Sequence, residues 1–178
     1  YSQTVTHDTD GTVTTVGKNL KTQKIMSSET YKGNEPTGIW TDGWYDEPRT
    51  LDYNFQLVYS NKICADTIAG IKDYFKNDDK LHYLAPKVEG GDLMQVLIKT
   101  ATYPSQAKDE NISGEVAVSF TVTADGKIEN VVVAKGKHIL LDKEVVRVFR
   151  GIKLLSGPTL NGQPISVCVT RKFGFFIE

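Results

Sequence analysis

The chain has 178 residues, of which 39% are apolar and 24% charged, a composition typical of folded proteins and not of disordered ones. Its formal net charge is -1 and its basic residues are scattered among acidic ones, so we expect no nucleic-acid partner. No apolar run approaches the roughly 20 residues that span a bilayer. Because the chain starts at Tyr1 instead of Met, we expect it to be a processed form. A signal peptide or a membrane anchor can precede Tyr1 in the unprocessed protein.

The N-terminal part of the chain, to about residue 60, favours β-strands. Thr12–Val16 alternates β-branched residues and follows the turn signal Asp10-Gly11. Residues 33–38 have loop chemistry, because glycine supplies a positive φ and proline fixes its own φ. Short aromatic strands are predicted at Ile39-Trp40, Trp44-Tyr45 and Tyr53–Tyr59.

The aromatic residues of this part permit two interpretations. The residues concerned are Trp40, Trp44, Tyr45 and Tyr53. They form either a platform for sugars or peptides or a small β-core. Because aromatic residues are favoured in strands, the core is the interpretation that we adopt.

Two helices are predicted in the middle of the chain. The first covers Cys64 to Phe75, where apolar residues recur at helical spacing. A charged loop at residues 76–80 and a break at 86–91 follow it. Asp92 is then expected to cap a second helix that ends near Thr100, because its carboxylate can accept orphan backbone N–H groups. The buried stripe of that helix is expected to consist of Leu93, Val96, Leu97 and Thr100.

The clearest local pattern is a β-hairpin. Glu115–Thr123 alternates, with Val116, Val118, Phe120 and Val122 on one face. We expect that face to be core and the opposite face to be solvated. Asp125-Gly126 then turns the chain into a second strand over Ile128–Ala134.

A helix and a last strand complete the pattern. Pro104 is expected where a helix begins, because proline is tolerated at the first helical position. The longer helix is predicted over Leu141–Ile152, with one apolar face that covers the hairpin. Three basic residues are expected on its solvated face, namely Lys143, Arg147 and Arg150. Gly157-Pro158 ends this region, and apolar residues then alternate from Ile165 onward, interrupted by Arg171.

No constellation of residues indicates catalysis. The histidines His7, His82 and His138 are dispersed, and no phosphate loop or nucleophile elbow is present. We therefore expect no enzyme, no catalytic residue, no metal and no cofactor. Cys64 and Cys168 are expected to be separate small apolar side chains, and a disulfide in an oxidising compartment is the alternative.

An ordered set of motifs in the second half of the chain carries a family resemblance. The motifs are Tyr103-Pro104-Ser105-Gln106-Ala107, Gly114–Val122, Asp125-Gly126-Lys127-Ile128, Leu141-Asp142 and Asn161–Val167. Together they resemble the C-terminal domain of TonB energy transducers, of the Bacteroidetes type. That family usually carries Trp followed by Pro before its last strand, whereas this chain has Leu154–Pro158 without Trp.

The N-terminal part faintly resembles the MORN-type hairpin repeats that precede some TonB-like domains. The residues that carry this resemblance are Tyr31-Lys32-Gly33, Pro36–Trp40 and Tyr45-Asp46. Both resemblances together imply an α+β fold, with a small antiparallel sheet packed by helices behind a β-hairpin-rich N-terminal module. The expected division is a MORN-like module at 1–80, a linker at 81–90 and a TonB C-terminal-like domain at 91–178.

The TonB resemblance implies a function in the periplasm, or at the periplasmic face of the cell envelope. The domain would bind the TonB-box peptide of a TonB-dependent outer-membrane receptor, which adds a strand to a sheet edge. The partner-binding residues that it implies are Tyr103, Pro104, Ile165, Val167, Val169, Arg171 and Phe173. The alternatives are a strand whose edge is already covered and a scaffold or ligand-binding module without receptor coupling. A homodimer is a further expectation about partners.

Overall fold

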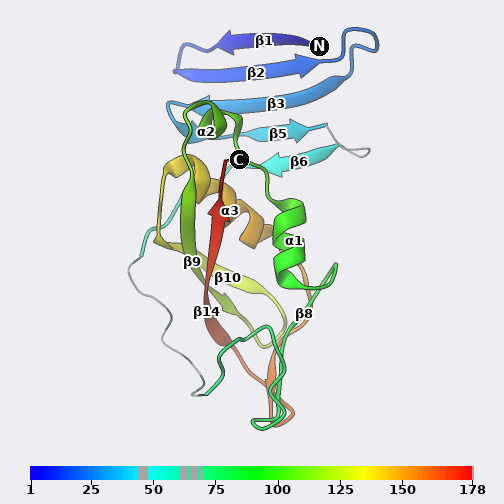
Figure 1. The fold of residues 1–178 in the computed structure, drawn as a ribbon, viewed down its shortest axis with the longest axis vertical. Helices are drawn as coiled ribbons and strands as arrows, with labels where there is room; N and C mark the ends of the chain where they lie inside the picture. Colours follow the sequence, from blue (N-terminus) through cyan, green and yellow to red (C-terminus); the bar gives the residue numbers. More distant parts are fainter. Residues whose placement is uncertain (44–47, 61–63, 65–67, 69, 178) are drawn as a thin grey trace. The chain divides into compact units, whose positions relative to one another are not determined.

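The structure is a computed structural model that describes residues 1–43, 48–60, 64, 68 and 70–177 (Figure 1). Its chain forms two compact units, Tyr1–Gln56 and Leu57–Glu178, which we call the N-terminal and C-terminal units. Antiparallel sheets and a few helices make up these units, so the predicted α+β class is confirmed.

The N-terminal unit is a meander of antiparallel strands. Its strand order is β1-β2-β3-β5-β6, and the short strand β4 pairs with β3. The first turn contains Gly11 at φ 82°, as the Asp10-Gly11 signal predicts. The strand bounds are Ser2–His7 (β1), Thr12–Lys18 (β2), Ile25–Lys32 (β3), Glu35–Pro36 (β4), Ile39–Asp42 (β5) and Arg49–Asp52 (β6).

The core of this unit is aromatic. Trp40 is 1% exposed and lies between Tyr31 and Tyr53, at ring-centroid distances of 4.9 and 4.3 Å. Its indole N–H donates to the carbonyls of Thr30 and Thr37, so its polar atom is satisfied. The core interpretation therefore holds for Trp40 and Tyr53. Trp44 and Tyr45 lie outside the described residues.

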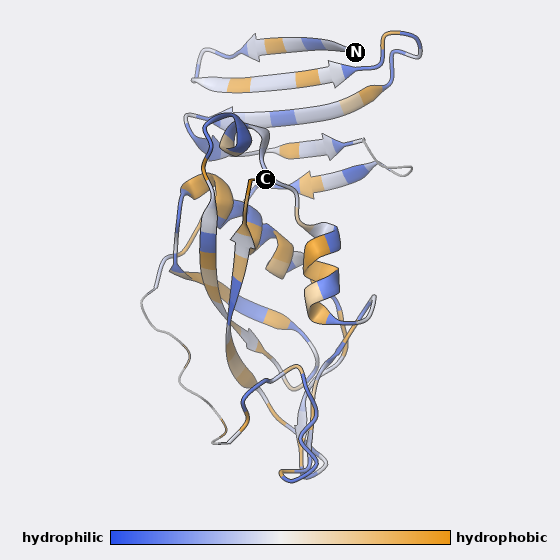
Figure 2. Ribbon diagram, in the orientation of Figure 1, coloured by the Kyte–Doolittle hydropathy of each residue, from blue (hydrophilic) through white to orange (hydrophobic). Residues whose placement is uncertain are grey.

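The C-terminal unit is built on a three-stranded antiparallel sheet of order β10-β9-β14. The strands are Gly114–Val122 (β9), Ile128–Lys135 (β10) and Val167–Phe175 (β14). Helix α3, Ile139–Gly151, packs on one face of this sheet, where Phe120 meets Phe149 at a centroid distance of 5.0 Å. Figure 2 shows hydrophobic positions recurring along α3, the strands of this sheet and helix α1, Leu93–Thr100. The predicted hairpin and covering helix are thus confirmed.

Two shorter helices precede the hairpin. Asp92 caps α1, Leu93–Thr100, by accepting from the backbone N–H groups of Met94 and Gln95. Leu93 and Leu97 are buried, whereas Thr100 is exposed and does not belong to the buried stripe. Helix α2, Ser105–Asp109, begins directly after Pro104.

Short strands connect the remaining parts of this unit. Within residues 81–90, β7 and β8 pair with strands that follow α3, namely β12 and β11. Gly157, which follows β11, passes so close to the β9–β10 turn that a Cβ there would overlap the carbonyl oxygen of Ala124. The bounds are Tyr83–Leu84 (β7), Lys87–Val88 (β8), Leu154–Ser156 (β11), Thr159–Leu160 (β12) and Gln163–Pro164 (β13).

Two elements predicted within residues 53–75 are wrong. Tyr53–Tyr59 is not a strand. β6 ends at Asp52, and Tyr59 pairs with Val133 in an isolated bridge. Among the described residues of Cys64–Phe75 there is no helix, and Gly70 has a φ of 95° that a right-handed helix excludes. Both segments have the right residue types, but their contacts with β10 and β14 determine their conformation.

Two predicted solvated faces are partly buried. On β9, Ala117 and Ser119 are 8% and 3% exposed, because this face of the sheet is not left bare. On α3, Lys143 is 2% exposed, and Arg147 forms a bidentate pair with the fully buried Glu144, at 2.7 Å for each bond. Arg150 is exposed, as expected.

Candidate functional site

The candidate site is the open edge of β14, the outer strand of the C-terminal sheet. The strand covers Val167–Phe175, so it begins and ends two residues later than the predicted Ile165–Phe173. Ile165 lies before it and donates its N–H to the carbonyl of Pro158 at 3.0 Å. On the other side, β14 pairs with β9 in unbroken register along its whole length.

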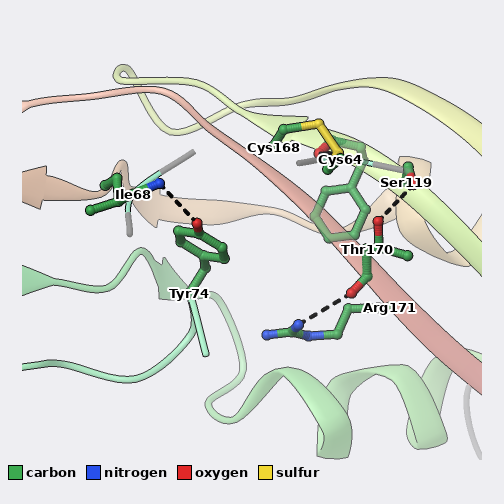
Figure 3. Close-up of a disulfide and its surroundings, with 8 residues drawn as sticks. Cys64, Ile68, Tyr74, Ser119, Cys168, Thr170 and Arg171 are labelled. Carbon is green, nitrogen blue, oxygen red and sulfur yellow. Dashed lines mark hydrogen bonds between the residues drawn. A yellow bond between two sulfur atoms is a disulfide. The ribbon is translucent and has the colours of Figure 1, made fainter. Parts of the chain in front are cut away.

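The direction of the backbone groups follows from Thr170. Its carbonyl oxygen accepts a 3.3 Å hydrogen bond from Nη1 of Arg171, on the side of the strand away from β9 (Figure 3). In an antiparallel strand the N–H and C=O of one residue point the same way and alternate between neighbours. Cys168, Thr170 and Lys172 therefore present their backbone groups to the open edge. At Thr170 and Lys172, no backbone group elsewhere in the described part of the chain bonds to this edge.

The side chains of the predicted site point elsewhere. Val167 and Val169 are each 1% exposed, since they lie on the face that α3 covers. Phe173 is half-buried and packs against Phe175 at a centroid distance of 5.1 Å. A partner on this edge would meet mainly main-chain atoms, with the side chains of the outward residues beside them.

Arg171 is the exception, because its side chain lies at the edge. Its guanidinium pairs with the carboxylate of Asp73 and lies 5.4 Å from the ring centre of Phe75. The side chains of Arg171 and Asp73 are 23% and 39% exposed. Asp73 and Phe75 were not anticipated from the sequence, and no local motif identifies them.

Tyr103 and Pro104 lie together at the C-terminal end of β14. The Tyr103 ring packs edge-on against Phe175 at 5.1 Å, and its hydroxyl donates to the carbonyl of Ile112 at 2.7 Å. Burial raises the pKa of this phenol. Pro104 is buried. These contacts give both residues a packing role next to the candidate edge.

A disulfide joins Cys64 to Cys168, so the expectation of two separate thiols is wrong (Figure 3). The Cα atoms are 5.3 Å apart, which suits a bridge, although the cysteines are 104 residues apart in sequence. Cys168 stands opposite Thr121 in the register. The disulfide therefore places Cys64 on the sheet face that carries Ser119 and Thr121, opposite α3, and so helps to explain the burial of Ser119.

Other classes of site find no support in the described part of the chain. No group of three or more metal-ligating side chains lies together there. No described helix has the length and apolar character needed to cross a bilayer.

A comparison with known families identifies the segment that carries this edge. Residues 99–177 match the family model described as Gram-negative bacterial TonB protein C-terminal, while no curated protein matches the chain. The matched segment runs from the end of α1 to just beyond β14. The MORN-type and Bacteroidetes-type resemblances stay predictions. Residues 99–177 are thus similar to the TonB C-terminal family, whose members interact with proteins in the periplasm in the course of outer-membrane transport.

Proposed function

We propose that the C-terminal unit binds an extended receptor peptide by adding it as a strand to the open edge of β14. The peptide is the TonB box of a TonB-dependent outer-membrane receptor. The observation that carries this proposal is the pair of outward-facing residues Thr170 and Lys172, whose backbone groups have no backbone partner among the described residues. An incoming strand satisfies such groups by main-chain hydrogen bonds.

Contacts on both sides of β14 hold this strand in the extended conformation that such a partner needs. β9 holds β14 in register over nine residue pairs, and the Ser119 and Thr170 hydroxyls bond across the strands at 2.8 Å. Val167 and Val169 anchor the strand in the core below α3. A docking strand therefore meets a fixed template and orders little of the domain itself, which lowers the entropic cost of binding.

The test uses synthetic TonB-box peptides from receptors of the same organism and isotope-labelled protein. Peptide titration should shift the amide signals of Cys168, Thr170 and Lys172 more than those of β10. Thr170→Pro removes one outward N–H and should weaken binding about tenfold or more, because a lost backbone donor also disturbs its neighbours. Thr170→Ser keeps both the N–H and the hydroxyl that bonds to Ser119, and it serves as the matched control, with near-normal affinity expected.

The result that ends the proposal is equally definite. If no cognate peptide perturbs β14 at millimolar concentration, receptor coupling fails. One observation favours the alternative of an envelope scaffold in that case: the guanidinium of Arg171 already occupies an acceptor on the edge. The edge would then be a protected one that serves no partner.

A further inference from the structure

We propose that Arg171, Asp73 and Phe75 form a latch over the open edge of β14, which must open before a strand can dock there. This inference rests on the proposed docking at β14 and adds a regulation of that edge. The latch is a side chain of the strand itself, held in place by a segment that precedes the TonB-like domain in sequence.

The first element of the latch is the position of the guanidinium. Nη1 of Arg171 donates to the Thr170 carbonyl, and Nη2 pairs with Asp73 (Figure 3 shows the first contact). The Thr170 carbonyl is one of the acceptors that an added strand would use. A docking peptide must therefore displace the Arg171 side chain from the middle of the edge.

The second element is the segment that holds Arg171 there, residues 70–75, which we call the strap. Tyr74 in the strap is 5% exposed, and its carbonyl accepts from the Tyr83 hydroxyl at 2.9 Å. Burial raises the pKa of the Tyr83 phenol, so this donor keeps its proton. The backbone N–H of Phe75 donates to the Asp73 carboxylate at 3.0 Å, which orients it toward Arg171.

The third element is the tether. Cys64 precedes the strap and is bonded to Cys168, which lies on the latched strand itself, three residues before Arg171. A covalent link of this kind keeps the strap at a high effective concentration near the edge. The latch can therefore open and close again without the strap leaving β14.

The structure gives the latch a modest strength. The ion pair is partly exposed, and such pairs contribute little, as do cation–π contacts at exposed sites. In most molecules of the free protein the latch is closed. The apparent affinity for a peptide is then the affinity of the open form multiplied by the fraction of molecules in which the latch is open. Removing the Asp73 charge should raise the affinity about two- to fivefold.

The experiment compares the wild type with Asp73→Asn and with the control Asp79→Asn, which makes the same charge change in the loop after the strap. The probe is a synthetic TonB-box peptide, and binding kinetics are recorded by surface plasmon resonance. Asp73→Asn should raise the association rate and leave dissociation nearly unchanged, because the latch acts on the free protein. High ionic strength should narrow the difference from the wild type, since it screens the ion pair.

The outcomes separate this inference from the proposed function. Equal association rates for Asp73→Asn and the wild type overturn the latch and leave docking intact. An equal gain in Asp79→Asn assigns the effect to overall charge and also overturns it. If no variant binds any peptide, docking fails, and sedimentation at high concentration decides about the latch: a bared edge should self-associate more in Asp73→Asn, and equal sedimentation overturns it.

Discussion

One edge of the C-terminal sheet is closed at Val133 by main-chain hydrogen bonds, and the other is covered at Thr170 by a side chain. On β10, the N–H of Val133 donates to Val58 at 2.8 Å, and its carbonyl accepts from Ser60 at 2.9 Å. These bonds are those of a parallel strand pair at Tyr59. On β14, the guanidinium of Arg171 covers the carbonyl of Thr170, and the backbone groups of Lys172 have no backbone partner in the described chain.

This difference indicates which edge is available to a partner. Breaking the β10 closure would leave a donor and an acceptor of Val133 unpaired, which is costly in a residue that is 1% exposed. Opening the β14 latch exchanges one partly exposed ion pair for solvent. The same upstream segment thus closes one edge firmly and the other reversibly, and the reversible edge is the one that we propose for docking.

The largest effect is expected from the strand between the two edges. Phe120 is 1% exposed and packs against Phe149, so Phe120→Ala should lower the free energy of unfolding by about 3–5 kcal/mol. Denaturant melts measure the loss. Phe176→Ala is the matched control, because Phe176 is 71% exposed, and it should cost less than about 0.5 kcal/mol. Similar small losses for both variants would contradict the core on which both edges depend.

The next effect concerns the disulfide that ties the upstream segment to β14. Reduction should lower the free energy of unfolding by about 2–4 kcal/mol, because the bridge closes a long loop in the unfolded chain. Thermal melts followed by circular dichroism measure the shift. Both tryptophans lie within the first 56 residues, so tryptophan fluorescence should show the N-terminal unit unchanged. If the melting temperature of the C-terminal unit is the same with and without reductant, the bridge does not stabilise this unit.

The smallest expected effect distinguishes the β10 edge from the β14 edge. Tyr59 donates from its hydroxyl to the buried Asp142 at 2.9 Å. This bond holds Val58–Ser60, the segment that pairs with β10, against α3. Tyr59→Phe should cost about 1 kcal/mol, the usual value of one hydrogen bond. Amide hydrogen exchange should become faster at Val133 and stay the same at Thr170. Equal acceleration at both residues would mean that the two edges open together and that our comparison is mistaken.

Local patterns predicted the elements whose partners are close in sequence. The β9–β10 hairpin follows from alternation and the Asp125-Gly126 turn, where Gly126 adopts a φ of 79°. The apolar stripe of α3 and the Asp92 cap of α1 were likewise visible, because each depends on residues within a few positions. The position of the candidate edge followed from the family pattern, with an error of two residues at each end of β14.

Long-range contacts determined what the sequence did not reveal. The apolar residues of Cys64–Phe75 have helical spacing, yet the disulfide and the Asp73–Arg171 pair fix described parts of this segment against β14. The strand propensity of Tyr53–Tyr59 was equally misleading, because propensity in strands depends strongly on context. One signal was available: an oxidising compartment, which the TonB resemblance implied, favours joining two cysteines.

The disulfide also determines how the C-terminal unit responds to mechanical load. A pull applied through the N-terminal unit enters at Leu57 and reaches Cys64 after a short stretch of chain. Once the hydrogen bonds of Val58 and Ser60 to β10 and of Tyr59 to α3 have broken, the covalent bond passes the tension to Cys168, so the segment between the two cysteines, 104 residues apart, lies outside the covalent force path. β9, β10 and α3 belong to that segment, so the tension along the covalent path does not unfold them one after another. The tension therefore arrives on β14, the same strand that would grip a docked peptide.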